Sequence, residues 1–114
     1  MVYTGLDSLI FATLLREQQP LVVLFSKEKC PLCQNFKPIF AQISERPEFS
    51  DIYKFFIMDC DKDPLIAKKL GISGVPSVYV FLENDGIECD YPNDPQSGYD
   101  EQSLVDFLSN LMHN

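Results

Sequence analysis

Two cysteines separated by two residues, Cys30 and Cys33, are the side chains in this sequence best suited to chemistry. They follow an apolar run and stand at the start of a segment with helical periodicity. A helix N-terminus offers unpaired N–H groups and about half a unit of positive charge, which favours a thiolate over a thiol. Cys33 lies one turn further on the same face, within reach of a mixed disulfide formed at Cys30. The spacing predicts a disulfide-exchange site with Cys30 as nucleophile and Cys33 as resolving cysteine.

The residues around this pair fit the same chemistry. Pro31 falls at the first helical position, where a missing N–H has no energetic cost. Lys27 and Lys29 precede Cys30, and their positive charges are expected to lower its pKa. Glu28 lies between them and acts in the opposite direction. Its side chain is interpreted as a solvated surface carboxylate, with a role as proton carrier as the alternative.

The other two cysteines leave a zinc site open as an alternative. Zinc needs four ligands, and Cys60 and Cys89 would complete a set with the first pair, with His113 in reserve. No second C-x-x-C pair is present, so redox exchange is favoured, and neither a metal nor another cofactor is expected. Cys60 and Cys89 are interpreted as buried thiols, with a regulatory thiol as the alternative.

The elements that must position the cysteine pair alternate between helix and strand. Strands are expected where apolar runs occur, at 21–25, 51–59, 77–82 and 87–91, the last two joined by a turn at Asn84-Asp85-Gly86. Helices are expected from a capping box at Thr4 and Asp7 to Pro20, over 31–46, from a cap at Asp63-Pro64 to Gly71, and from about Asp100. This order predicts one α/β domain over residues 1–114, with a mixed central sheet and helices on both faces.

Apolar residues at helical spacing are expected to face this sheet. In the first helix they are Leu6, Leu9, Ile10, Leu14 and Leu15. Aromatic side chains are expected to supply much of the remaining core, namely Phe36, Phe40, Phe55, Phe56 and Phe81.

Charge narrows the range of partners. Seventeen acidic against nine basic residues give a net charge of −8, the wrong sign for binding nucleic acid or anionic lipids. All nine bases lie within residues 1–69 beside nine of the acids, so the net charge comes from residues 70–114. If the loop at 91–98 borders the site, this acidic half of the chain is expected to repel acidic partners and to favour neutral or basic ones.

Sequence features also bear on the compartment. No apolar run approaches the ~20 residues of a membrane helix. The first residues lack the basic start and cleavage site of a signal peptide. A monomer in the reducing cytoplasm is therefore expected.

With these features the chain resembles the thioredoxin family over nearly its whole length. The matching features are the C-x-x-C at a strand-to-helix turn, a helix proline at Pro38, Asp61 and Pro64 before the third helix, and Gly74-Val75-Pro76 before a strand. In that family the residue matching Pro76 is a cis-proline against the cysteine pair, and the backbone before it pairs with substrate. The resemblance implies that Gly74, Val75 and Pro76 bind substrate, and that Gly98 borders the groove.

The resemblance also implies an activity. It is thiol–disulfide exchange with protein or peptide disulfides in cell redox homeostasis, with electrons from a reductase or a small thiol and no bound cofactor. The family's buried carboxylate would fall at Leu24 and its lysine partner at Ile57, and both are apolar here. These two residues support an alternative function, a redox-sensing adaptor or binding module with little turnover.

Overall fold

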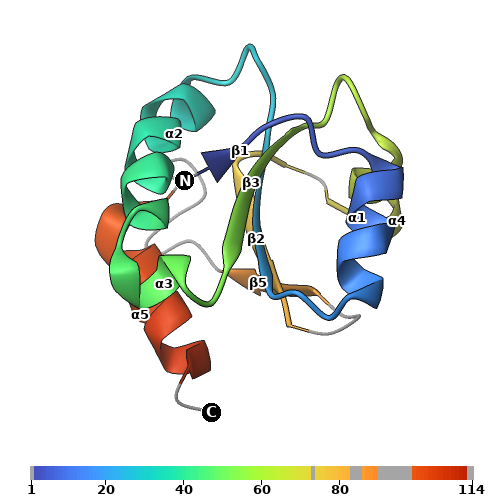
Figure 1. Ribbon diagram of the computed structural model, residues 1–114. Coiled ribbons are helices and arrows are strands. Elements are labelled where there is room, and N and C mark those ends of the chain that lie inside the picture. Colours follow the sequence, from blue (N-terminus) through green and yellow to red (C-terminus); the bar gives the residue numbers. More distant parts are fainter. Residues whose placement is uncertain (1, 73, 83–85, 90–98, 113–114) are drawn as a thin grey trace.

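A five-stranded mixed sheet forms the centre of the protein in the computed structural model, which describes all residues except 1, 73, 83–85, 90–98 and 113–114 (Figure 1). Its strands, in the spatial order β1-β3-β2-β4-β5, are β1 (Val2–Tyr3), β2 (Leu21–Ser26), β3 (Lys54–Asp59), β4 (Ser77–Phe81) and β5 (Gly86–Cys89). β3 is parallel to β1 and β2, whereas β4 is antiparallel to β2 and β5. The predicted mixed sheet is confirmed. Of the turn expected at Asn84-Asp85-Gly86, the first two residues lie outside the described residues, and Gly86 is the first residue of β5.

Helices cover both faces of the sheet, as predicted. On one face lie α2 (Pro31–Ser44), α3 (Pro47–Ser50) and α5 (Glu101–Met112), and on the other lie α1 (Ser8–Arg16) and α4 (Leu65–Leu70) (Figure 1). β2 is buried along its whole length because both of its faces are covered. Within the described residues, no helix is long and apolar enough to cross a membrane.

The two faces of β2 contribute to two separate core clusters. Val22 and Leu24 pack with side chains of α2 and α5, whereas Leu21, Val23 and Phe25 pack on the side of α4. The five predicted core aromatics are all buried, namely Phe36, Phe40, Phe55, Phe56 and Phe81.

The first helix begins later than the sequence predicts. Asp7 is its N-cap, and the Asp7 carboxylate accepts a hydrogen bond from the N–H of Ile10 at 2.8 Å. Thr4 therefore does not open the helix, and the predicted capping box is wrong. The physical reason is the two-residue strand Val2–Tyr3, which pairs with β3 and leaves Thr4 in the connection that follows it.

The apolar face predicted for this helix is also partly wrong. Leu9 is 74% exposed and Ile10 is 44% exposed. The inward face is carried by Leu14 and Leu15, as predicted, together with Phe11, which the prediction left out, and Leu6 is buried just before the helix. Phe11 makes an edge-to-face contact with Phe81 of β4, with ring centroids 4.9 Å apart.

A short helix that the sequence reading missed shifts two other boundaries. α2 ends at Ser44, because Arg46 is the N-cap of α3 and Pro47 is its first residue. A proline at a first helical position was the one available signal for this element. β3 then begins at Lys54 rather than at residue 51.

Asp63 has a wider role than the predicted cap. Pro64, rather than Asp63, occupies the N-cap position of α4, and the Pro64 side chain makes no capping hydrogen bond. The Asp63 carboxylate accepts from the N–H of Leu65 at 3.3 Å and also from the N–H of Ser8 at 3.1 Å. It therefore joins the starts of α1 and α4. Gly71 ends α4 as predicted, with a φ of 71° that favours glycine.

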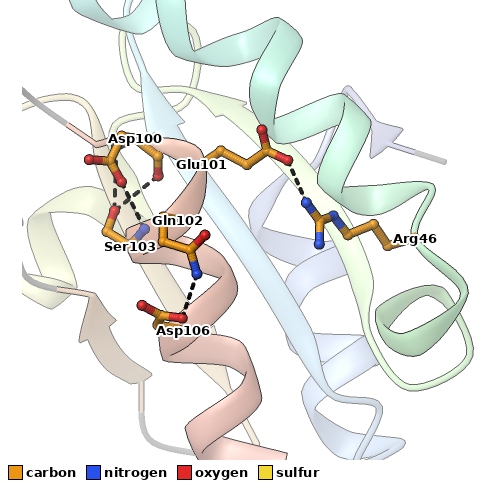
Figure 2. A network of polar contacts seen from close by, with 6 residues as sticks. All are labelled: Arg46, Asp100, Glu101, Gln102, Ser103 and Asp106. Carbon is orange, nitrogen blue, oxygen red and sulfur yellow. Dashed lines mark hydrogen bonds and ion pairs between the residues drawn. The ribbon is translucent and has the colours of Figure 1, made fainter.

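The start of α5 is fixed by polar contacts (Figure 2). The Asp100 carboxylate accepts from the N–H of Ser103 at 2.8 Å, which caps the helix. Glu101 forms an ion pair with Arg46, so the first turn of α5 is tied to the segment between α2 and α3. The helix begins within one residue of the expected position.

Candidate active site

One end of the sheet brings together segments that are distant in sequence. β2 and β3 are parallel neighbours, so both carboxyl ends lie at this end, at the top of Figure 1. β4 is antiparallel to β2 and begins here, with Ser77 in register with Phe25. The loop after β2 leads to Cys30 and the loop before β4 contains Val75, 45 residues away. The topology therefore places these two loops side by side.

Cys30 and Cys33 form a disulfide at the start of α2. Cys30 is the N-cap of the helix, and its Sγ accepts a hydrogen bond from the N–H of Cys33 at 3.2 Å. Pro31 occupies the first helical position, as predicted. The Cα atoms of the two cysteines are 5.2 Å apart. The unpaired donors of the helix N-terminus therefore face the sulfur of Cys30, where they favour negative charge.

The two sulfur atoms differ in accessibility. Cys33 has an exposed fraction of 0%, whereas Cys30 is only half-buried. The Cys30 Sγ lies 3.8 Å from the carbonyl oxygen of Val75. An approaching disulfide therefore meets Cys30 first, beside the backbone of the loop before β4.

That loop carries the residues matched to substrate binding. The Val75–Pro76 peptide bond is cis, Pro76 is buried, and Gly74 is exposed. The hydroxyl of Ser77 donates to the carbonyl oxygen of Gly74 at 2.6 Å, which fixes the path of the loop. Val75 thus lies next to Cys30, with Gly74 before it in the same loop, while Gly98 lies outside the described residues.

The charged residues before Cys30 all face solvent. Lys27, Glu28 and Lys29 are exposed. The side-chain amide of Gln34 donates to the carbonyl oxygen of Glu28 at 2.9 Å, which holds this loop against α2. An exposed Glu28 fits the solvated carboxylate of the sequence interpretation, and the effect of the two lysines on Cys30 stays a prediction.

The position matched to a buried carboxylate is part of the core. Leu24 is fully buried and stands in register with Ile57 of β3 and with Val78 of β4. All three belong to, or pack against, the cluster on the α2 face. This part of the sheet is therefore apolar, and a proton leaving Cys33 meets no carboxylate at Leu24.

Sequence reasoning missed a cavity of about 250 Å³ that opens beside the disulfide. Lys27 and Val75 line it together with Cys60, Asp61 and Lys68. Three separate segments supply these residues, so no local spacing in the sequence signalled the cavity.

Cys60 is a free, buried cysteine, in agreement with the sequence interpretation. It follows β3, and its N–H donates to the carbonyl oxygen of Ser26 at 2.9 Å. Burial raises the pKa of the Cys60 thiol, and the carboxylates of Asp59 and Asp61 raise it further, while Lys27 lowers it. The thiol is therefore protonated at neutral pH.

We expect Cys60 to react slowly with iodoacetamide when the Cys30–Cys33 pair is oxidised. At pH 8 its alkylation rate, followed by peptide mass mapping, should be at least about tenfold below that of a free cysteine peptide. Because the pKa is raised, the rate should keep increasing at alkaline pH where the peptide thiol has levelled off. If the rate for Cys60 levels off at or below the pH at which the peptide's rate does, then Lys27 lowers the Cys60 pKa more than burial raises it.

Metal-binding potential is limited in the part of the chain that the structure describes. There, no three His, Cys, Asp or Glu side chains gather into a possible metal site. The side chain of Cys89 and the residue His113 lie outside that part.

Comparisons with known proteins agree with this geometry. The family model described as Thioredoxin matches residues 5–110. The chain is 28% identical over 97 residues to a thioredoxin of Rickettsia bellii, covering 84% of this chain and 85% of that one. It is 27% identical over 96 residues to the protein disulfide-isomerase erp38 of Neurospora crassa, covering 83% of this chain but only 25% of that protein.

A solved structure supports the fold. The thioredoxin of Malassezia sympodialis superimposes with a TM-score of 0.79 at 24% sequence identity, covering 96% of this chain and 91% of that chain. The family match and the disulfide at the start of α2 together support a thiol–disulfide oxidoreductase function. The chain therefore belongs to the thioredoxin family.

Proposed function

We propose that Cys30 is the attacking cysteine and Cys33 the resolving cysteine in disulfide exchange with protein or peptide substrates. The observation that supports this assignment best is the asymmetry of the pair. The half-buried Cys30 sulfur receives the Cys33 N–H at the helix N-terminus, and the Cys33 side chain is fully buried. Cys33 is therefore shielded from a substrate but adjacent to any mixed disulfide formed at Cys30.

The exchange proceeds in two balanced steps. The Cys30 thiolate attacks one sulfur of the substrate disulfide, and the other substrate sulfur leaves as a thiolate that takes up a proton. Cys33 then loses its proton and attacks the Cys30 sulfur, which releases the second substrate thiol. The substrate gains two electrons, and the protein is left with the Cys30–Cys33 disulfide seen in the structure.

Substrate binding is assigned to the loop before β4. In the proposal an extended substrate segment pairs with the backbone at Val75, next to Pro76, with Gly74 and Gly98 bordering the groove. The proximity of the Val75 carbonyl oxygen to the Cys30 sulfur, 3.8 Å, supports this placement. Lys27 and Lys29 would favour the Cys30 thiolate.

The proposal extends to the oligomeric state, the compartment and the source of electrons. Residues 1–114 act as one monomeric domain in the cytoplasm, and a separate reductase or a small thiol returns the pair to the dithiol. The unpaired Cys60 thiol supports a reducing compartment.

A Cys33→Ser variant tests these roles. Mixed with a disulfide-bonded peptide, it should accumulate a covalent adduct at Cys30 and release only one peptide thiol, because serine cannot resolve the mixed disulfide. Intact-mass measurement and peptide mapping detect the adduct, and the wild-type protein should release both thiols. An adduct at another cysteine, or full release by the variant, contradicts the assignment.

Turnover separates an enzyme from the alternative, a redox-sensing adaptor. The apolar pair Leu24 and Ile57 favours the adaptor, because nothing at these positions carries a proton to or from Cys33. Repeated insulin reduction with an excess of dithiothreitol measures the difference. A reduction potential near about −270 mV would indicate a reductant, and one well above about −200 mV an oxidant or isomerase.

A further inference from the structure

The cavity lined by Val75 is smaller than a typical ligand pocket. Its volume is about 250 Å³. This is below the roughly 300–1,000 Å³ typical of pockets for drug-sized ligands. Val75, whose carbonyl oxygen lies 3.8 Å from the Cys30 sulfur, forms part of its wall together with Gly74. A group bound against this part of the wall therefore lies close to the reacting sulfur.

The wall of the cavity combines apolar and basic residues. Ala67, Ile72 and Val75 line it and also pack with the core cluster on the α4 face. Lys27, from the loop after β2, and Lys68, from α4, supply two positive charges. This combination suits a short aliphatic stem that ends in an anionic group.

The two lysines are not neutralised by their surroundings. Neither Lys27 nor Lys68 has an ion-pair partner among the described residues, and both are exposed. Among the described residues that line the cavity, Asp61 is the one carboxylate, and Asp59 also acts on the Cys60 thiol in its wall. The described lining residues themselves carry two positive charges against one negative charge, on a chain whose net charge is −8.

The charge of Lys27 acts inside the cavity as well as at its edge. Burial raises the pKa of the Cys60 thiol, Lys27 lowers it, and the carboxylates of Asp59 and Asp61 raise it. Cys60 lies in the same cavity wall. An anion in the cavity would therefore meet the field of this lysine in a partly desolvated environment.

A substrate segment at Val75 would pass this cavity. An extended chain advances about 3.3 Å per residue and points alternate side chains to opposite sides. When the target cysteine of the substrate is at Cys30, a side chain one or two residues away reaches the cavity.

We propose that the cavity between Lys27, Lys68 and Val75 is a specificity subsite that binds an acidic side chain next to the target cysteine of a peptide or protein substrate. The proposal rests on the proposed function, because it assumes that substrates react at Cys30. It assigns the subsite to glutamate or aspartate, with the lysines facing the carboxylate and the apolar wall facing the stem.

Two matched disulfide-bonded peptides test the subsite. They are identical except that the residues flanking one cysteine are Glu in the first and Gln in the second. Reduced wild-type protein should react with the Glu peptide roughly three- to tenfold faster at low salt. The net charge of −8 would by itself disfavour the Glu peptide, so this preference has to come from local contacts.

The Glu-to-Gln rate ratio is the decisive quantity. A change in Cys30 reactivity alters both rates equally and leaves the ratio unchanged. The K27Q/K68Q variant should bring the ratio to 1 or below. Lys54 is an exposed lysine at the opposite end of β3, so K54Q should keep the wild-type ratio.

The outcomes separate this inference from the function on which it rests. A wild-type ratio of 1 or below, or a preference that survives in K27Q/K68Q, overturns the subsite. Reduction of the Gln peptide by wild-type protein but not by Cys30→Ser would uphold disulfide exchange even then. If neither peptide reacts with wild-type protein, the proposed function itself fails.

Discussion

Replacing Cys30 by Ser is expected to lower the rate of reaction with a disulfide-bonded peptide by at least about 10³-fold. A hydroxyl group is not ionised at neutral pH and does not displace a thiolate from a disulfide. Cys33 cannot substitute for the missing nucleophile, because its side chain has no exposed surface. The loss should therefore be nearly complete rather than partial.

The measurement is the second-order rate constant for appearance of the first peptide thiol under single-turnover conditions. Cys33→Ser is the comparison, because it removes the other half of the pair but should retain this first step. Circular dichroism of both variants checks that the fold is intact. If the Cys30→Ser protein still reacts at more than a few per cent of the wild-type rate, another cysteine is the nucleophile.

Leu24→Asp is expected to reduce the free energy of unfolding by about 4 kcal/mol or more at neutral pH. Leu24 is fully buried, and its neighbours in register, Ile57 and Val78, are apolar. The variant loses the burial of a leucine side chain and gains a carboxylate without a partner in the apolar cluster. Because domains are stable by only about 5–15 kcal/mol, this is a large part of the total.

Urea denaturation measures the loss, and Leu9→Asp is the matched control. Leu9 is 74% exposed on α1, so the same substitution there should change the free energy of unfolding by less than about 1 kcal/mol. If Leu24→Asp does not fold, Leu24→Ala should still fold and give a measurable unfolding transition. Its free energy of unfolding should be lower than that of the wild-type protein by about 2–5 kcal/mol. A loss below 1 kcal/mol in both Leu24 variants would contradict the packed, apolar surroundings of this residue.

Strongly periodic or strongly capped segments could be predicted from the sequence. β2 is an unbroken apolar run, and Pro31 directly after Cys30 marked the start of α2. The shorter elements could not be predicted because a segment of two to four residues is too short to show a helical or strand periodicity. Strand Val2–Tyr3 exists through its pairing with β3, and the four-residue helix α3 follows a single proline signal.

The side of a helix that faces the sheet was harder to predict from the sequence than the presence of the helix. Phe11 lies three and four residues before Leu14 and Leu15 and shares their side of the helix, whereas Leu9 lies on the opposite side and is exposed together with Ile10. The side that faces the sheet is selected by tertiary packing, as in the contact between Phe11 and Phe81 of β4. A sequence pattern alone does not record this long-range constraint.

The sequence by itself determined the cysteine pair, its place at a helix N-terminus and the α/β order of elements, because these depend on neighbouring residues. The tertiary structure alone decided which cysteine is the more accessible one and what surrounds it. Val75, Lys27 and Lys68 come from three different segments, and they meet because β2 and β3 end, and β4 begins, at one end of the sheet. Strand pairing brings together charges that no local spacing connects, and this is why the basic cavity is visible only in the folded protein.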